Sequence, residues 1–223
     1  MLLELLDEQH RCTILGWSKG ELIAQVHAFD LFAYGVAPRA RIGVLLQPGI
    51  GSAVGLIAAL TWHCAVPLSP TGTAEGAAAQ LRTCGCTCLV ASGGMAIAEE
   101  AAALAGIPLV TLYPKKAPAP EGTFEMQPPA PGSGSTRTAA LAMRGDDAAL
   151  VLLTSGTTGQ SKRVVFPLRR LIEGGRAIAD SLALTQDDVA LNLLPLHHVG
   201  GIACNLMAPL ASGSRLRCEP RFD

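Results

Sequence analysis

The stretch TSGTTGQSK, residues 154–162, follows directly on AALVLL (148–153), an apolar run that predicts a buried strand. Its glycines allow the backbone to adopt positive φ values and to approach a ligand closely. Successive amide groups in such a loop form an anion-binding concavity, and hydroxyl and ammonium groups add donors for phosphate oxygens. We therefore expect a phosphate-binding loop that consists of Thr154, Ser155, Gly156, Thr157, Thr158, Gly159 and Lys162.

Two other interpretations of this segment can be weighed on its residues. It is not a Walker loop, because Ser161 rather than glycine precedes Lys162, and Arg163 rather than serine or threonine follows it. An ordinary hairpin turn would also be rich in glycine, serine and threonine. The uninterrupted run of these residues, the spaced lysine and the preceding core strand favour phosphate binding over a plain turn.

A second motif, LNLLPLHHVGGI, occupies residues 191–202. A histidine beside an apolar strand is by itself more often structural than functional, so the pair at 197 and 198 needs further context. Gly200 and Gly201 would let a helix begin close to a ligand, and the amides of a helix N-terminus favour an anion.

Short apolar runs alternate with helical patterns along the whole chain. Strands are predicted at 41–46, 65–68, 88–91, 108–112, 147–153, 164–166 and 190–194, with helices between them. Ser18 and Glu21 form a capping box, and the helix that it opens carries an apolar stripe of Leu22, Val26, Phe29 and Ala33. Strands that are apolar throughout and separated by helices predict an α/β fold, with parallel sheets covered by helices on both faces.

The segment 114–138 interrupts this alternation with KKAPAPEGTFEMQPPAPGSGSTR. A stretch so rich in proline, glycine and serine predicts a flexible connector. We therefore expect three parts: an N-terminal α/β subdomain at 1–113, the linker at 114–138, and the start of a nucleotide- and acyl-binding subdomain at 139–223.

Composition excludes several classes of protein. The chain has 223 residues, 17 basic against 18 acidic, and no basic stripe, so a nucleic-acid partner has little electrostatic support. The N-terminus lacks a basic leader before an apolar run, so no signal peptide is expected. The longest apolar stretch, 53–68, is shorter than the roughly 20 residues of a membrane span, so none is predicted.

The seven cysteines indicate a reducing, intracellular setting. Cys84, Cys86 and Cys88 alternate, which would place all three on one face of a strand. Zinc ligand pairs usually have two to four residues between them, so we expect small apolar packing groups and no metal site.

TSGTTGQSK resembles the phosphate-loop signature of the adenylate-forming superfamily, which includes acyl-CoA and aryl-CoA synthetases, firefly-type luciferases and peptide-synthetase adenylation domains. LNLLPLHHVGGI resembles the next signature of that superfamily, at a fitting spacing. Weaker similarity extends to GVAPRARIGVLL (35–46) and AALTWHCAVPLSP (58–70). The segment from 192 onward looks most like oxalate-CoA-ligase-like and peptide-synthetase-like proteins. The resemblance implies the N-terminal portion of the adenylate-forming ligase fold.

The resemblance also implies a two-step reaction. A small carboxylic acid attacks the α-phosphorus of ATP, pyrophosphate leaves, and a thiol, of CoA or of a carrier protein's phosphopantetheine, displaces AMP. The loop at 154–162 would hold the departing phosphates, with Mg²⁺ bound to ATP. His198 would be the catalytic residue that orients the carboxylate, Gly200 and Gly201 would line the acyl site with it, and His197 would be structural.

This chain departs from the family pattern at two positions, since Ser161 stands where proline is usual and Arg163 where glycine is usual. Neither position supplies the main phosphate donors, so we expect a shifted loop exit and an intact site. The superfamily's later signatures, which contact adenine, hold the ribose and supply a lysine from a mobile C-terminal domain, would lie beyond Asp223. We therefore expect the 223-residue chain alone to be inactive.

Two alternatives to a ligase stay open. One is a truncated, non-catalytic homologue or nucleotide-binding module. The other is an unrelated phosphate-binding α/β protein such as a kinase-like domain, against which the PLHHVGG segment and the missing Walker loop both count. For a ligase, the expected location is intracellular, in the cytoplasm or the peroxisome.

Overall fold

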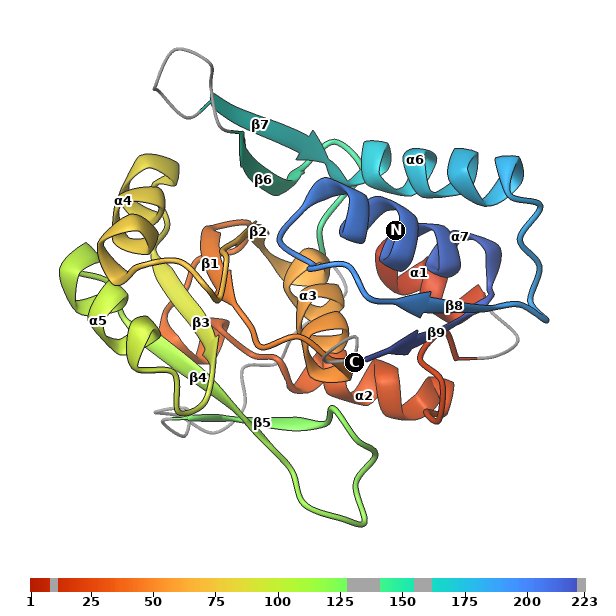
Figure 1. The fold of residues 1–223 in the computed structure, drawn as a ribbon, viewed down its shortest axis with the longest axis horizontal. Coiled ribbons are helices and arrows are strands. Elements are labelled where there is room, and N and C mark those ends of the chain that lie inside the picture. The colour runs from red at the N-terminus through yellow and green to blue at the C-terminus, as the bar shows by residue number, and fades with distance from the viewer. Residues whose placement is uncertain (9–11, 128–140, 155–161, 220–223) are drawn as a thin grey trace.

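The computed structural model describes residues 1–8, 12–127, 141–154 and 162–219 (Figure 1). Its main sheet has the strand order β5-β4-β3-β1-β2-β6-β7. In chain order these strands are β1 (Arg41–Leu45), β2 (Cys64–Pro67), β3 (Cys88–Ser92), β4 (Leu109–Pro114), β5 (Phe124–Gln127), β6 (Ala148–Thr154) and β7 (Lys162–Pro167). The five central strands run parallel, whereas β5 and β7 pair antiparallel at the two edges.

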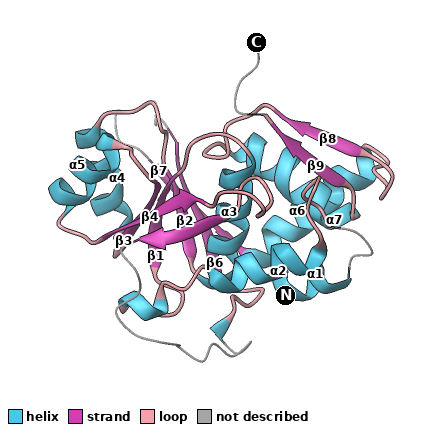
Figure 2. Ribbon diagram, turned by 90° about the horizontal axis from the view of Figure 1, so that it is seen from below, coloured by secondary structure: helices cyan, strands magenta, loops and turns pink. Residues whose placement is uncertain are grey.

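Helices cover both faces of this sheet (Figure 2). One face carries α1 (Leu2–Glu8), α2 (Lys19–Ala28) and α3 (Ile50–Trp62), and the other carries α4 (Ala74–Cys84) and α5 (Ala96–Ala105). Within the described part of the chain, no helix is both long and apolar enough to cross a bilayer.

Two hydrophobic cores lie on the two faces of the sheet. Along β3, Cys88 and Val90 belong to the core under α3, whereas Leu89 and Ala91 belong to the core under α4 and α5. Side chains alternate between the faces of a strand, so a strand buried on both faces must be apolar throughout. This confirms the predicted α/β class.

A smaller unit follows the main sheet along the chain. α6 (Leu168–Ser181) leads to the parallel strand pair β8 (Val189–Asn192) and β9 (Arg215–Cys218). Between these strands lie the π-helix η3 (Gly201–Met207) and α7 (Ala208–Ser212). The predicted apolar helix after Gly200 is therefore a π-helical turn followed by a short α-helix.

The start of α2 confirms the predicted capping box. The Ser18 hydroxyl oxygen accepts from the Glu21 amide at 3.2 Å, and the Glu21 carboxylate accepts from the Ser18 amide at 2.7 Å. The helix ends at Ala28, earlier than the apolar stripe predicted, and Ala33 belongs to the 3₁₀ turn η1 (Phe32–Tyr34).

The predicted linker at 114–138 differs from the structure in its first half. β5 pairs with β4 in this segment, and Phe124 is buried in the core under α3. The buried Gln25 side chain donates to the Phe124 carbonyl oxygen at 3.0 Å, and the Trp17 indole donates to the Glu121 carbonyl oxygen at 2.8 Å. Residues 128–138 lie outside the described part.

The main sheet also continues across the predicted subdomain boundary. β6 pairs in parallel with β2 through Ala65 and Leu150, so 1–113 and 139–223 contribute strands to one sheet. The polar segment at 114–138 therefore does not divide the hydrophobic core, because β2 before it and β6 after it are neighbours in one sheet.

The three alternating cysteines do not share a strand face. Cys84 is the last residue of α4, Cys86 lies in the following turn, and Cys88 begins β3. Cys84 and Cys86 belong to the core under α4 and α5, whereas Cys88 faces the opposite core. Burial raises the pKa of Cys86 and of Cys88 to about 12, so both thiols stay protonated at neutral pH.

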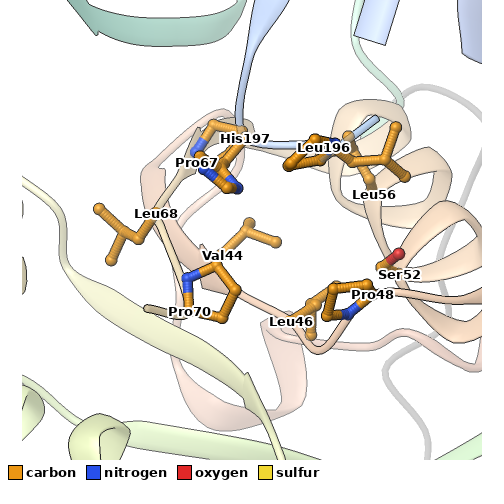
Figure 3. A pocket seen from close by; sticks show the side chains of 11 residues that line it. Val44, Leu46, Pro48, Ser52, Leu56, Pro67, Leu68, Pro70, Leu196 and His197 are labelled. Atoms are coloured by element: carbon orange, nitrogen blue, oxygen red, sulfur yellow. The ribbon is translucent and has the colours of Figure 1, made fainter. Parts of the chain in front are cut away.

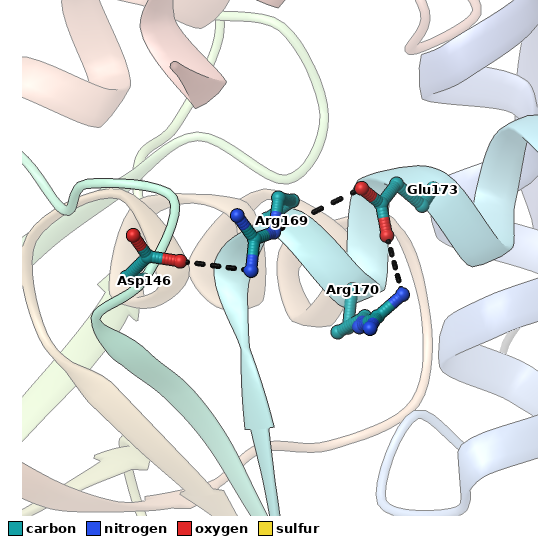
Figure 4. Close-up of polar contacts among 4 residues, drawn as sticks. All are labelled: Asp146, Arg169, Arg170 and Glu173. Atoms are coloured by element: carbon teal, nitrogen blue, oxygen red, sulfur yellow. Dashed lines mark hydrogen bonds and ion pairs between the residues drawn. The ribbon is translucent and has the colours of Figure 1, made fainter.

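Surface ion pairs join the first turn of α6 to Asp146, which lies just before β6 (Figure 4). The Arg169 guanidinium lies 3.0 Å from the Asp146 carboxylate, and Glu173 pairs with both Arg169 and Arg170. All four side chains are well exposed, so each pair contributes little to stability.

We predict that Gln25→Leu destabilises the protein. The substitution leaves the buried carbonyl of Phe124 without its donor, which costs about 1–3 kcal/mol. The free energy of unfolding, measured by urea denaturation, should fall by that amount. Gln186→Leu, at an exposed glutamine, is the matched control and should change it by less than about 0.5 kcal/mol. Equal stabilities of the two variants would show that the β4–β5 hairpin is not held by this contact.

Candidate functional site

The carboxyl ends of the parallel strands define one edge of the main sheet. β1, β2 and β6 are consecutive neighbours there, and they end at Leu45, Pro67 and Thr154. Neighbouring strands lie about 4.8 Å apart, so the carboxyl ends of these three strands lie side by side. In open α/β sheets this edge is where ligands bind.

The predicted phosphate loop connects β6 to β7 at this edge. Thr154 and Lys162 are partners in the antiparallel register, and the Thr154 hydroxyl donates to the Lys162 carbonyl oxygen at 3.4 Å. Both side chains are exposed. The structure thus fixes the two ends of the loop, while the intervening predicted residues lie outside the described part: Ser155, Gly156, Thr157, Thr158 and Gly159.

The exit of the 154–162 loop is hydrogen-bonded to α4, on the face of the sheet away from α3. The Arg163 guanidinium on β7 donates to the Thr83 carbonyl oxygen in the last turn of α4 at 2.9 Å. The Arg41 guanidinium donates to the next carbonyl, that of Cys84, at 3.0 Å. Cations at a helix C-terminus interact favourably with its unpaired carbonyls. Arg163, one of the two residues that depart from the family pattern, therefore has a structural role next to Lys162.

Hydrogen bonds around Asn192 hold the segment that follows β8, residues 195–198, which we call the PLHH segment. The Asn192 side-chain oxygen accepts from the Leu194 amide at 3.1 Å and from the Asn205 side chain at 2.9 Å. The His198 amide donates to the Pro195 carbonyl oxygen at 3.2 Å. A Cβ at Gly201 would lie 2.5 Å from the same Pro195 oxygen, so this close approach requires glycine.

The two histidines differ in their surroundings. His198 is exposed, whereas His197 is half-buried, with the two rings 4.1 Å apart. His197 and Pro67, at the end of β2, line the same small cavity (Figure 3). Burial, and to a smaller extent the neighbouring His198, lower the pKa of His197.

His197 and Leu196 roof a small cavity of about 30 Å³ over the ends of β1 and β2. Sequence reasoning assigned the functional role to His198 and left His197 structural. The structure places His197, together with Pro67, in the lining of this cavity, and His198 is not among the lining residues. The adjacent apolar run gave no signal for this position, because it depends on how β8 is docked.

Among the described residues, no cluster of carboxylates lies at the carboxyl edge of the main sheet. Among them, no group of three or more His, Cys, Asp or Glu is placed to hold a metal ion. Residues 148–167 also contain no Asp or Glu. β6, β7 and the connection between them therefore supply no carboxylate for a metal ion.

Comparison with known proteins decides the family. The model of the family described as AMP-binding enzyme matches residues 25–223. The chain belongs to this family. A Mycobacterium tuberculosis CoA ligase, named for a methyl-dioxo-octahydroindenyl propanoate, is 32% identical over 208 residues, which cover 88% of this chain and 40% of that protein. Mouse mitochondrial malonate–CoA ligase is 39% identical over 78 residues, 35% of this chain and 13% of that protein.

Solved structures of AMP-binding enzymes show the same fold. Apo MatB from Rhodopseudomonas palustris superposes with a TM-score of 0.80 at 22% identity, covering all of this chain and 45% of MatB. O-succinylbenzoate CoA synthetase from Bacillus subtilis in complex with AMP gives 0.72 at 21% identity and 56% coverage. The chain thus spans less than half the length of the curated relatives that it matches.

We predict a pH effect from His197. Its folded-state pKa is lowered below the unfolded value of about 6.5, so the unfolded chain binds the proton first. The stability that neutral His197 contributes is present above about pH 6.5 and is lost as pH falls below it. Urea denaturation from pH 7.5 to 5 should show a shallower loss of stability for His197→Gln. An NMR titration midpoint of His197 at or above 6.5 would contradict this.

Proposed function

We propose that this chain is the N-terminal part of an AMP-forming acid–thiol ligase that acts through an acyl-adenylate. The observation that supports the proposal most is that this member of the AMP-binding family has TSGTTGQSK at the connection from β6 to β7, and a PLHH segment that lines a cavity at the ends of β1 and β2. Relatives named as CoA ligases support it.

The chemistry proceeds in two balanced steps. A carboxylate oxygen forms a bond to the α-phosphorus of ATP, and the bond to pyrophosphate breaks. A thiol then loses its proton to solvent, its sulfur bonds to the acyl carbon, the carbon–oxygen bond of the mixed anhydride breaks, and AMP leaves with that electron pair. Negative charge develops on phosphate oxygens throughout, so positioned donors and orientation of the reactants contribute most to catalysis.

The proposed site residues would each have a part in these steps. The 154–162 loop binds the β- and γ-phosphates, and the Lys162 ammonium stabilises them as pyrophosphate departs. His198 orients the carboxylate beside the α-phosphate, with Gly200 and Gly201 at the acyl group. Mg²⁺ bound to ATP offsets phosphate charge. The thiol belongs to CoA or to a carrier's phosphopantetheine, and the relatives' names favour CoA.

These co-substrates suggest where the ligase acts. ATP and CoA are supplied inside the cell, and we place the protein in the cytoplasm or the peroxisome. The malonate–CoA ligase of mouse is named as mitochondrial, so a fusion of this chain to a fluorescent protein should be scored against markers for all three compartments.

A second candidate function is a non-catalytic, nucleotide-binding relative. The observation that favours it is that Ser161 and Arg163 stand where the family usually has proline and glycine. The two candidates differ in one measurable property, which is turnover once the rest of a ligase is supplied.

We predict that the 223-residue chain alone does not catalyse ATP–pyrophosphate exchange. Adenylation needs the nucleotide and the acid held together in reactive geometry, and the relatives that do so are more than twice as long. Exchange should be measured with malonate, sulfoacetate, methylmalonate and O-succinylbenzoate, with R. palustris MatB as the positive control. Robust exchange by the chain alone with any of these acids would contradict the prediction.

A chimera tests the site directly. Residues 1–223 joined to the remaining part of R. palustris MatB should catalyse exchange, and Lys162→Ala should lower kcat/KM for ATP by roughly 10- to 150-fold, because a charge-assisted hydrogen bond contributes about 1.5–3 kcal/mol. His198→Ala should instead depress adenylation and change the kinetics of the acid, with little effect on ATP affinity.

Lys116→Ala, at an exposed lysine before β5, is the matched control and should leave both substrates unaffected. A chimera that melts as cooperatively as MatB but shows no exchange would favour the non-catalytic relative. If Lys162→Ala left ATP kinetics unchanged and only lowered Tm, the 154–162 segment would be a structural turn.

A further inference from the structure

A second hollow, of about 350 Å³, opens at the same sheet edge over β1, β3 and β4. The loop after β1 leads to α3 on one face of the sheet, whereas the loop after β3 leads to α5 on the other face (Figure 2). The strand order reverses between these neighbours, since β2 lies on one side of β1 and β3 on the other. Such a topological switch point is where open α/β sheets form ligand crevices. We call this hollow the switch-point cavity.

Hydrogen bonds between separate segments build the walls of the switch-point cavity. The Gln47 amide donates to the Ser92 hydroxyl oxygen at 3.0 Å, which ties the β1 loop to the end of β3. The Gly93 amide donates to the Leu112 carbonyl oxygen at 2.9 Å, which ties β3 to β4. The outer wall, residues 121–124, is held by the Trp17 and Gln25 contacts described above. The cavity is therefore formed before any ligand binds.

The β4–β5 hairpin also approaches the start of α3 closely. Gly122 has φ +87°, and a Cβ there would lie 2.5 Å from the Ile50 side chain. The Thr123 hydroxyl in the same wall is buried, with no hydrogen-bond partner in the described part of the chain. A buried polar atom without a partner is costly unless water or a ligand supplies one.

The lining indicates the chemistry of the ligand. Leu46, Ile50, Leu112 and Phe124 provide apolar walls, and the first turn of α3 reaches the cavity at residues 50–52. The N-cap of α3, Gly49, provides no side-chain cap, and the first turn of α3 carries no acid, so its amides are suited to an anion. The one carboxylate among the lining residues, Glu121, is exposed. A volume in this range and a mostly apolar lining with few polar groups are typical of small-molecule sites.

We infer that the switch-point cavity binds a small monoanion with an aromatic or branched apolar body, its carboxylate at the N-terminus of α3 and its body against Leu46, Leu112 and Phe124. This site is separate from the proposed phosphate loop, because β2 lies between β1 and β6. It shares only Leu46, Pro48 and Ser52 with the small cavity under His197.

The probe is 2-naphthoate, with the uncharged 2-naphthamide as its matched partner. Titrations of the intact 223-residue protein, followed by calorimetry and by amide NMR shifts, require neither ATP nor turnover. We expect 2-naphthoate to bind about ten-fold more tightly than 2-naphthamide, since the α3 N-terminus favours the charge. The largest shifts should fall on Ile50, Gly51 and Ser92.

Gly51 offers a variant that separates binding from folding. A Cβ there would lie 3.7 Å from the nearest atom, an ordinary contact, and Asp in a first turn stabilises a helix. Gly51→Asp should therefore keep or raise Tm while it weakens 2-naphthoate binding about ten-fold. Gly51→Asn, of the same size but uncharged, should weaken it less than about three-fold.

Two results would overturn the inference. One is equal binding of 2-naphthoate and 2-naphthamide, which would show an apolar hollow without anion preference. The other is unchanged 2-naphthoate binding in Gly51→Asp, with shifts away from residues 46–52. Neither result bears on the ligase proposal, whose failure would appear only in the exchange assay of the chimera.

Discussion

Parallel pairing of β2 with β6 is the constraint on which the rest of the structure depends. It makes one sheet from strands that are far apart in the sequence, and it brings their carboxyl ends to a common edge. Two contacts support this pairing before β6 begins. The Met143 amide donates to the Thr61 carbonyl oxygen of α3 at 2.8 Å, and the Arg39 guanidinium pairs with the Asp147 carboxylate at 2.6 Å. If β6 were displaced by one strand, its carboxyl end would no longer lie beside that of β2.

One partner of the Arg39–Asp147 pair has an unusual backbone conformation. Arg39 has φ +61°, in the left-handed region that a residue with a Cβ occupies only at some cost. Its side chain is held by the ion pair with Asp147. Partial burial alone would raise the pKa of Asp147, but hydrogen bonds from the Arg39 side chain and the Arg144 amide outweigh it and hold that pKa below its usual value. The carboxylate is therefore charged at neutral pH. The ion pair then joins the residues just before β1 to those just before β6.

The fold was largely predictable from the sequence, because strands buried on both faces must be apolar throughout, and the runs at 41–46, 88–91 and 147–153 all became strands of one sheet. β5 was missed because FEMQ alternates and stands among prolines, and its pairing with β4 depends on a distant glutamine, Gln25. The cysteines were misplaced because period-two spacing was taken for a strand where a helix end and a turn intervene. For the candidate site, the sequence pointed to the loop and the histidine pair, but the place of His197 in the cavity that Pro67 also lines depends on the docking of β8, which no local pattern encodes.

The two halves of the candidate site differ in how firmly they are held. The 154–162 loop starts and ends on β6 and β7, which pair along their whole length within a large sheet, and Arg163 fixes its exit to α4. The PLHH segment instead follows β8, whose Val189 and Leu191 are exposed and whose partner in the described residues is β9. A two-stranded ribbon is marginal by itself, so η3, α7 and the buried Asn192 must supply the rest of its support. Geometry at the ends of the 154–162 loop is therefore set by the main sheet, whereas geometry of the PLHH segment is set by one polar side chain and the packing of a π-helical turn.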